Sequence, residues 1–340
     1  MATIHDVAKL AKVSIATVSR VMSGADPVNP KTQQRVLEAM EKLNYRPNGL
    51  ARNLRSQKSH VIIALVPDIK NPFFSEVIRG IEDEARREGF NVLIGSTDGD
   101  KDKAKEYISL LEESRADGMI LTTTQTDEAF LEAFAARNPV VLACEYLTGS
   151  ELPSVSIDNE SAARKITKHL IEQGHNRIAH IMGPSHVILS QARMNGYRQA
   201  LRQHGIPEDE LLIQEGDYSL ESGYAITRKL LSISRKPTAI FAANDEMAIG
   251  AMRAIHEAGL RVPEDIAVAG FDDINIASYV IPSLTTIQQP RYAIGQRSVQ
   301  MLIRLIRNEL LEQPQIVLED TLVIRESSTP KTVERQEGSR

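Results

Sequence analysis

MATIHDVAKLAKVSIATVSRVM, residues 1–22, holds two short helical patterns that are separated by Val13 and Ser14. In the first pattern, apolar side chains recur every three or four residues and so form one face of a helix. These side chains are Ile4, Val7, Ala8 and Ala11. Ser14 is a suitable N-cap residue for the second helix, Ile15–Met22, because its hydroxyl can accept a hydrogen bond from the first helical turn.

The second helix has an apolar side and a side of small and polar residues. Its apolar side, which can point back to the first helix, consists of Val18, Val21 and Met22. The other side carries Ile15, Ala16, Thr17, Ser19 and Arg20. A third helical pattern over 31–44 completes a core with Val36, Leu37, Met40 and Leu43. Three short helices with a tight first turn predict a helix-turn-helix headpiece, whose second helix enters the major groove of DNA.

The distribution of charge supports this prediction. Residues 1–60 contain 10 Lys or Arg and 4 acidic residues, a net charge of +6, whereas the remaining residues carry −11. A basic end on an acidic body steers that end toward polyanions. The alternative is a small helical domain with a solvated basic face.

Length and composition place the chain among soluble proteins of two or three domains. It has 340 residues, of which 42% are hydrophobic, enough for a large core. Cys144 is the single cysteine, which excludes an intrachain disulfide and suits a reducing compartment. No apolar run reaches the length of a membrane span, and the N-terminus lacks the order of a signal peptide. We therefore expect a cytoplasmic protein with no membrane partner.

Residues 47–60, PNGLARNLRSQKSH, form a basic linker in which Asn48 can cap a short hinge helix. Ala51, Leu54 and Arg55 would lie along one side of that helix. On a duplex, Leu54 can wedge into the minor groove and unstack a base step, with Arg55 near phosphate. An ordinary basic tether is the alternative.

From residue 60 onward, apolar strand patterns alternate with amphipathic helical patterns. Strands are expected at 60–68, 91–98, 118–124, 140–146, 154–159, 177–183, 211–217, 239–246 and 266–273. Helices are expected at 73–88, 101–115, 127–137, 161–173, 192–204, 220–233, 247–258 and 291–310. This alternation predicts parallel sheets covered on both faces, and there are enough strands for two α/β lobes. The segment 284–290 and the last helix are expected to cross back to the first lobe.

Polar side chains recur where the predicted strands end, which is where parallel sheets bind ligands. They are Asp68, Asp98, Glu145, Asp217, Asn244, Asp245, Asp272 and Asp273. Aromatic residues lie nearby, namely Phe73, Phe74, Tyr146, Tyr218 and Phe271, and Arg193, expected to open the fifth helix of this region, adds a cation. Two lobes with such groups could clamp a small polyhydroxylated molecule. A strand-end carboxylate can also serve only as a helix cap.

Two other classes of protein share an α/β layout of this kind. An exported solute-binding protein would need a signal peptide and no headpiece. A nucleotide- or sugar-processing enzyme would need a phosphate-binding glycine motif or a catalytic constellation, and neither is found in the sequence. His180 lies within an apolar run and is expected to be a core residue. We expect no catalytic residue, no metal site and no cofactor.

The chain resembles the lactose/galactose repressor (LacI/GalR) family over residues 3–326. The resemblance rests on TIHDVAKLAKVSIATVSRVM, YRPNGLARNL, VPDIKNPFFSEVIRGIE, LPSVSIDN, PTAIFAANDEMAIGAM, GLRVPEDIAVAGFDD and LTTIQQP. It implies a headpiece and hinge helix followed by a two-lobed, periplasmic-binding-protein-like body. It also implies a homodimer that binds a pseudo-palindromic double-stranded operator and whose affinity for the operator is changed by a small effector between the lobes. Induction and corepression are both compatible with it.

The resemblance also assigns residues. Major-groove contacts fall on Ile15, Ala16, Thr17 and Arg20, and minor-groove or hinge positions on Ala51, Leu54 and Arg55. Effector-binding positions fall on Phe73, Phe74, Glu145, Arg193, Tyr218, Asn244 and Asp272. Val187 and Leu189 replace an arginine and a threonine that contact a purine base in another branch, which disfavours a free purine. The nucleoside-responsive branch is the most similar, so we expect a nucleoside effector, with a sugar or sugar derivative as the alternative.

The expected domain boundaries follow from these patterns. They are 1–47 for the headpiece, 48–60 for the hinge helix, 61–160 with 291–320 for the first lobe, 161–290 with 321–327 for the second lobe, and 328–340 for a polar tail.

Overall fold

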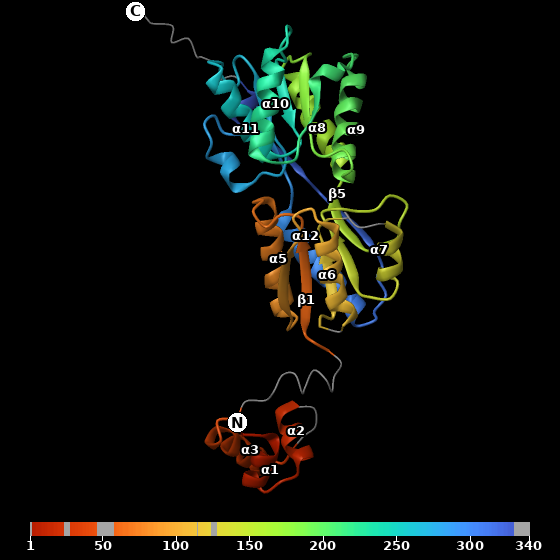
Figure 1. The fold of residues 1–340 in the computed structure, drawn as a ribbon, viewed down its shortest axis with the longest axis vertical. Helices are drawn as coiled ribbons and strands as arrows, with labels where there is room; N and C mark the ends of the chain where they lie inside the picture. The colour runs from red at the N-terminus through yellow and green to blue at the C-terminus, as the bar shows by residue number, and fades with distance from the viewer. Residues whose placement is uncertain (1, 24–27, 46–57, 114, 124–127, 330–340) are drawn as a thin grey trace, which may run out of the picture. The chain divides into compact units, whose positions relative to one another are not determined.

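The computed structural model of this chain describes residues 2–23, 28–45, 58–113, 115–123 and 128–329. The chain divides into two compact units, Met1–Ser59 and His60–Arg340, and each is described by itself. Figure 1 shows the order of their elements along the chain. Among the described residues, every helix is too short or too polar to span a lipid bilayer.

The N-terminal unit consists of three helices around a small apolar core. They are α1 (Ile4–Ala11), α2 (Ile15–Ser23) and α3 (Pro30–Lys42). The buried side chains of this core are Val7, Ala8, Ala11, Val18, Val36 and Ala39. The predicted helix-turn-helix arrangement is confirmed, because the turn between α1 and α2 contains only three residues.

Short-range hydrogen bonds define the ends of α1 and α2. Thr3 and Asp6 form a reciprocal capping box at the start of α1. Lys12 ends that helix in a left-handed conformation (φ 51°). The Ser14 hydroxyl oxygen accepts a hydrogen bond from the Thr17 backbone N–H at 3.1 Å, so Ser14 caps α2 as predicted.

The prediction that Leu37 belongs to the core is wrong. Its side chain is 52% exposed, whereas Ala39 is 3% exposed. Helix α3 begins at Pro30 after an Asn29 cap, and Val36 and Ala39 then share the face turned to α1. Leu37 lies about 100° farther around the helix.

In the C-terminal unit, the structure describes two parallel sheets. The strands of the first lobe are β1 (Val61–Val66), β2 (Asn91–Ser96), β3 (Gly118–Leu121), β4 (Val140–Ala143), β5 (Ser154–Ile157) and β11 (Gln315–Leu318). Those of the second lobe are β6 (Ile178–Met182), β7 (Ile213–Glu215), β8 (Ala239–Ala242) and β9 (Ala267–Ala269). The orders are β11-β5-β4-β3-β1-β2 and β7-β6-β8-β9. The predicted two α/β lobes with parallel sheets are confirmed.

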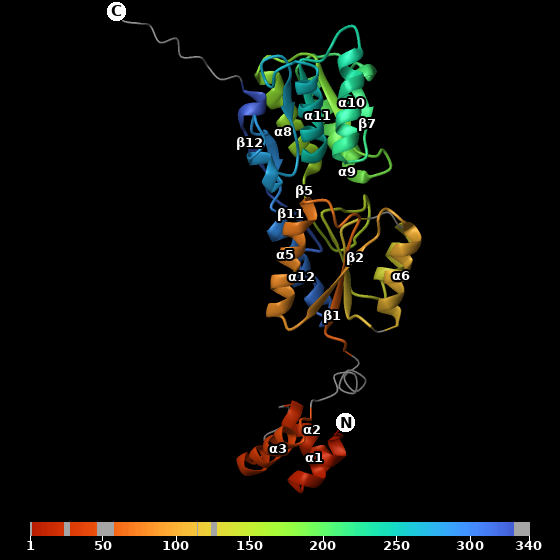
Figure 2. The same ribbon diagram turned by 60° about the vertical axis from the view of Figure 1, so that its left-hand side comes forward.

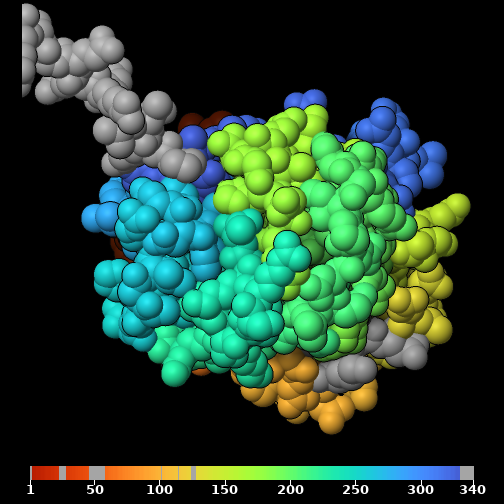
Figure 3. All heavy atoms as spheres, turned by 90° about the horizontal axis from the view of Figure 1, so that it is seen from above, coloured from red at the N-terminus to blue at the C-terminus, as the bar shows by residue number. Residues whose placement is uncertain are grey.

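Helices cover both faces of each sheet (Figures 1 and 2). The first lobe carries α5 (Phe73–Arg87), α6 (Lys101–Glu112), α7 (Glu128–Ala135) and α12 (Arg291–Ile306). The second carries α8 (Asn159–Glu172), α9 (Ile188–Gln203), α10 (Leu220–Ser232) and α11 (Asp245–Glu257). Figure 3 views the second lobe end-on, with α8 and α9 in green tones beside α10 and α11 in teal to cyan. Side chains alternate along β1: Ile62 and Val66 join the cluster that contains α5, whereas Ile63 and Leu65 pack with α6 and α7.

Within residues 128–329, the chain passes between the lobes three times. It does so after β5, again between β10 (Thr286–Gln288) and α12, and again between β11 and β12 (Thr321–Val323). β10 and β12 pair antiparallel beside the second lobe, so the two later crossings are hydrogen-bonded to each other. The expected return of 284–310 to the first lobe is confirmed by the packing of α12 against α5 and β4.

Helices α5 and α12 approach each other closely because two glycines lie at their contact. A Cβ atom on Gly80 would clash with the Tyr292 carbonyl oxygen, and one on Gly295 with the Val77 carbonyl oxygen. Neither clash involves a flexible side chain, so the helices would have to move apart.

We predict that Gly295→Ala destabilises the protein by about 1–3 kcal/mol, because the added methyl group overpacks this contact. Urea unfolding followed by circular dichroism measures the change. Arg297→Ala, on the exposed side of the same helix, is the control and should stay within about 0.5 kcal/mol of the parent. Equal stability of the parent and Gly295→Ala would show that the helices can separate without cost.

Candidate functional site

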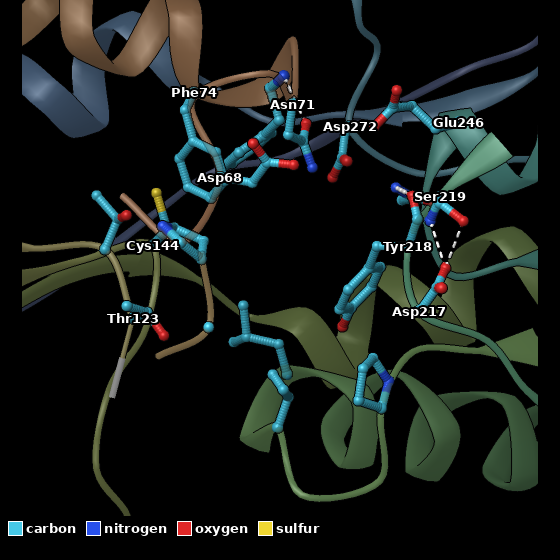
Figure 4. Close-up of a pocket in the computed structure, with 18 of the residues that line it drawn as sticks. Asp68, Asn71, Phe74, Thr123, Cys144, Asp217, Tyr218, Ser219, Glu246 and Asp272 are labelled. Atoms are coloured by element: carbon cyan, nitrogen blue, oxygen red, sulfur yellow. Dashed lines mark hydrogen bonds between the residues drawn. The ribbon is translucent and has the colours of Figure 1, made fainter. Parts of the chain in front are cut away.

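A cavity of about 710 Å³ lies between the two lobes of the C-terminal unit. Residues that follow the strands of both sheets line it (Figure 4). From the first lobe come Asp68 after β1, Thr122 and Thr123 after β3, and Cys144 after β4. From the second come Asp217 and Tyr218 after β7, Asn244 after β8 and Asp272 beyond β9. The cavity therefore lies where parallel sheets bind ligands.

All seven residues predicted to bind the effector line this one cavity. Phe73, Phe74 and Glu145 belong to the first lobe, and Arg193, Tyr218, Asn244 and Asp272 to the second. The structure thus brings them together, and their role in binding stays a prediction.

Arg193 is a buried cation held from several sides. Its Nε donates a hydrogen bond to Asn159 Oδ1 at 3.0 Å, and its Nη1 donates to the Ala243 carbonyl oxygen. Its guanidinium lies 3.8 Å from the centre of the Phe271 ring. These contacts orient the charge and offset its loss of hydration.

The prediction that Arg193 opens its helix is wrong. Helix α9 begins at Ile188, so Arg193 lies in the second turn. The N-cap residue Val187 has no side-chain hydrogen bond, and a helix start without a capping side chain gives no signal in the sequence.

Asp272 presents a carboxylate to the cavity. Its Oδ1 accepts a hydrogen bond from Gln289 Nε2 at 2.8 Å and lies 3.9 Å from Arg193 Nη1. In the described part of the chain, its Oδ2 has no hydrogen-bond partner. Burial raises the pKa of Asp272 to about 6, against the opposing effect of the Arg193 charge. A ligand hydroxyl or amine can therefore gain a buried acceptor here.

Asn244 is first of all a helix cap. Its Oδ1 accepts a hydrogen bond from the Met247 backbone N–H at 3.0 Å, at the start of α11. Its Nδ2 donates to the Tyr218 carbonyl oxygen at 2.9 Å. One amide hydrogen remains for a ligand, so Asn244 is both a structural and a candidate binding residue.

Aromatic side chains form opposite parts of the wall. Phe73 and Phe74 meet edge to face, with ring centres 5.0 Å apart. Tyr218 comes from the other lobe, and its hydroxyl lies 2.6 Å from the Ser190 hydroxyl. Val187 and Leu189 add apolar surface. A flat apolar group can be buried against these side chains.

Four non-glycine residues of the cavity wall have a left-handed backbone. They are Asp98 (φ 51°), Cys144 (φ 70°), Tyr218 (φ 71°) and Asp272 (φ 116°). This conformation is costly for residues with a side chain and collects at binding sites. The strand ends are thus shaped by the surrounding fold to direct these side chains into the cavity.

Some strand-end residues serve the architecture instead. The two carboxylate oxygens of Asp245 accept hydrogen bonds from the Thr286 hydroxyl at 2.6 Å and the Ile274 backbone N–H at 2.8 Å. Asp273 pairs with Arg325 at 2.7 Å. Both acids therefore hold the segments that cross between the lobes.

Neither His180 nor Cys144 has the properties of a catalytic group. His180 is fully buried, its Nδ1 lies 2.9 Å from the Phe241 carbonyl oxygen, and burial lowers its pKa to about 4. The prediction of a core histidine is confirmed. Burial raises the pKa of the Cys144 thiol, so the reactive thiolate is disfavoured.

Glu246 and Gln289 line the cavity and were missed by reasoning from the sequence. Glu246 lies in the first turn of α11, where an acid is expected to favour the helix dipole. Gln289 follows β10 on a crossing segment, so only the fold brings it to Asp272. One signal could have pointed to Glu246: it lies two residues after Asn244, at the carboxyl end of a predicted parallel strand.

In the N-terminal unit, the side chains predicted to read DNA lie on the outer side of α2. Ile15, Ala16 and Arg20 are exposed, and Thr17 is half-buried with its hydroxyl 2.9 Å from that of Ser14. The predicted hinge residues Ala51, Leu54 and Arg55 lie outside the described residues.

The chain matches two protein families along its length. Residues 3–48 match bacterial regulatory proteins of the lacI family, and residues 59–326 match the periplasmic binding proteins and sugar binding domain of the LacI family. It is 40% identical over 328 residues, 96% of each chain, to the HTH-type transcriptional repressor CytR of Escherichia coli strain K12. It is 38% identical over 328 residues to catabolite control protein A of Priestia megaterium, covering 96% of this chain and 99% of that one.

A solved structure agrees with this. The crystal structure of the Lac repressor dimer bound to operator and the anti-inducer ONPF has a TM-score of 0.87 and 32% identity, covering 96% of this chain and 99% of that one. A helix-turn-helix headpiece and a two-lobed body with a cleft at its strand ends define a DNA-binding regulator. The chain belongs to the lacI family of bacterial regulatory proteins, and its relative CytR is a transcriptional repressor.

The carboxylates of the cavity predict a pH dependence of stability. Burial, with the charges of Asp272, Asp68 and Glu221, raises the pKa of Glu246 from 4.5 to about 7. A carboxyl group with a raised folded pKa stabilises the native state below its unfolded pKa, and this contribution is lost as pH rises through the folded value. The window for Glu246 is therefore about pH 4.5 to 7.

The Tm of the parent should fall as pH rises from 5 to 8, because Glu246 becomes charged. We predict that the fall in Tm over this range is about 2–4 °C smaller for Glu246→Gln than for the parent. Differential scanning fluorimetry without ligand measures the two slopes. Leu220→Ala, which alters the same cavity wall without changing charge, should keep the parental slope. Parallel slopes for Glu246→Gln and the parent would contradict the assignment.

Proposed function

We propose that this chain is a repressor whose affinity for its operator is set by a nucleoside bound between the two lobes. The observation that carries the proposal is the composition of the cavity. Aromatic side chains from both lobes, Phe74 and Tyr218, share it with the buried Arg193 and Asp272. Aromatic faces suit a heterocyclic base, and the charged pair suits the hydroxyl groups of a ribose.

A sugar or sugar derivative is the second candidate. The group formed by Arg193, Asn244 and Asp272 can bind the hydroxyls of a plain sugar as well as those of ribose. A Lac repressor structure with ONPG and an Enterococcus faecium regulator with bound ribose show that relatives take sugars. A plain sugar would leave much of the aromatic and apolar wall uncovered, so the cavity favours the nucleoside.

For DNA, we propose that two copies of the chain bind a pseudo-palindromic operator through two headpieces. Arg20 would pair with guanine, and Ile15 and Ala16 would meet thymine methyl groups. Thr17 completes the major-groove surface. The exposure of these side chains on α2 supports this part, and the related Lac repressor dimer was solved on its operator.

We propose domain boundaries at 47, 60 and 160, with the return segments 291–320 and 321–327. The division of the chain into two compact units falls between Ser59 and His60, which supports the boundary at 60. β11 pairs with β5 of the first lobe, which supports the assignment of 291–320 to that lobe. The hinge role of Ala51, Leu54 and Arg55 rests on the family resemblance.

The proposed function predicts that a nucleoside changes operator affinity and that Asp272→Ala abolishes this response while leaving operator binding nearly intact. Isothermal titration calorimetry with nucleosides and sugars identifies the ligand, and fluorescence anisotropy on a selected operator gives the response. Asp265→Ala, which removes an exposed ion pair with Arg261, is the control and should behave like the parent. Binding of sugars alone would contradict the nucleoside, and loss of DNA binding by Asp272→Ala would indicate misfolding.

Recognition by Arg20 is tested separately. Arg20→Ala is expected to cost about 1–3 kcal/mol on the selected operator and to relax preference at one base pair. Arg20→Lys keeps the charge but loses bidentate geometry, and should therefore not restore the preference at that base pair. An equal loss of affinity for operator and random DNA would make Arg20 a phosphate contact instead.

A further inference from the structure

Among the charged side chains that line the cavity between the lobes, acidic residues outnumber basic ones. Among the described lining residues, seven are acidic and two, Lys70 and Arg193, are basic. Arg193 is already engaged with Asn159 and the Ala243 carbonyl oxygen, and Lys70 is exposed at the edge. The field inside the cavity is therefore negative and attracts ligands that carry hydrogen-bond donors or positive charge.

Two of these carboxylates come from different lobes. Asp68 follows β1 in the first lobe, and Glu246 lies in the first turn of α11 in the second. Figure 4 shows both pointing into the cavity from opposite walls, with Asp272 near Glu246. The charge of Asp68 contributes to the raised pKa of Glu246, as do Asp272 and Glu221. The two acids therefore face one cavity from different lobes, and a ligand in that cavity lies between them.

Most carboxylate oxygens of Asp68, Glu246 and Asp272 accept no hydrogen bond from the described part of the chain. Within the described part of the chain, the Glu246 carboxylate has no hydrogen-bond or ion-pair partner, and the Asp68 carboxylate accepts only from the Lys70 backbone N–H at 2.8 Å. Asp272 is 5% exposed, and its Oδ2 is likewise without a partner in that part. Asp272 is a buried acceptor with an unused oxygen, which is costly, and Asp68 and Glu246 beside it are half-buried. A ligand that supplies donors therefore gains most at this place.

We infer that the effector carries an amino group, held between Asp68 and Glu246, and that it carries no phosphate. An amino group has two or more N–H donors and can bind one carboxylate from each lobe. A phosphate has only acceptors at neutral pH and would face several carboxylates. A metal ion is not favoured, because no group of three or more suitable side chains is placed to hold one among the described residues.

The aromatic wall gives this amino group a position. Phe74 lines the cavity from the same lobe as Asp68 and follows it by six residues. A heterocycle packed on Phe74 would place its edge toward the Asp68 carboxylate, with Glu246 on the wall formed by the other lobe. This inference rests on the proposed function, because it takes a nucleoside as the effector and adds that Asp68 and Glu246 bind an amino group of that nucleoside.

Ligand pairs that differ at one group test the inference. We propose isothermal titration calorimetry on the full chain with cytidine and uridine, adenosine and inosine, and glucosamine and glucose. In any pair that binds, the amino member should bind about tenfold more tightly, because the keto or hydroxyl group of its partner offers at most one donor at that position and cannot serve both carboxylates. Cytidine 5′-monophosphate should bind about tenfold more weakly than cytidine.

Variants then locate the selectivity. The double variant Asp68→Asn, Glu246→Gln should reduce the preference for the amino member to less than about threefold, while affinity for the keto or hydroxyl partner is kept. Asp98→Asn is the matched control: its carboxylate lines the same cavity but is held by Lys103 at 2.6 Å, so the preference should persist. Operator binding by the double variant verifies that it folds.

Each outcome is decisive. Equal affinity within every pair that binds, or a preference that survives the double variant, overturns the amino-group inference. The nucleoside effector still stands in that case if a nucleoside pair is among those that bind. Binding of glucosamine ahead of glucose with no nucleoside bound contradicts the proposed nucleoside and supports the inference. Binding of none of the six ligands overturns both.

Discussion

The parallel direction of the strands is the constraint on which the rest of the C-terminal unit depends. All neighbouring strands within its two large sheets are parallel, so their carboxyl ends collect along one edge of each sheet. Both edges border the same cavity, which is why Thr122 and Cys144 face Asn244 and Asp272 across it. The sheets supply rigid support, and the short loops that follow the strands supply the chemistry.

Two consecutive aspartates join this cavity to the segments that cross between the lobes. Asp272 faces the cavity and is bonded to Gln289 at 2.8 Å, while Asp273 accepts from Gln288 at 2.8 Å and pairs with Arg325 at 2.7 Å. A ligand on Asp272 therefore contacts a residue bonded directly to a crossing segment. A ligand shifts a conformational equilibrium only through different contacts in the two states. A difference in the contacts of Asp272 would act directly on the segments that cross between the lobes.

Local patterns in the sequence were sufficient for most of the fold. The periodicity of apolar residues located the helices of the headpiece and the alternation of the two lobes, because burial of one face is a local property of a helix or strand. Leu37 was misplaced because a spacing of one residue moves a side chain by about 100°, and only packing against α1 selects Ala39. The start of α9 was misplaced because Val187 provides no capping side chain.

The sequence by itself determined the class of this protein: a basic headpiece, two α/β lobes and polar groups at the strand ends. It also identified seven residues that the structure gathers in one cavity. Only the tertiary structure decided which strand-end acids face a ligand and which hold the crossings. Asp245 turns to Thr286, whereas its neighbour Glu246 enters the cavity. The physical reason is that a side chain's burial and charge environment depend on elements remote in sequence, and Asp68 and Glu246 line one cavity only because the fold places the two lobes side by side.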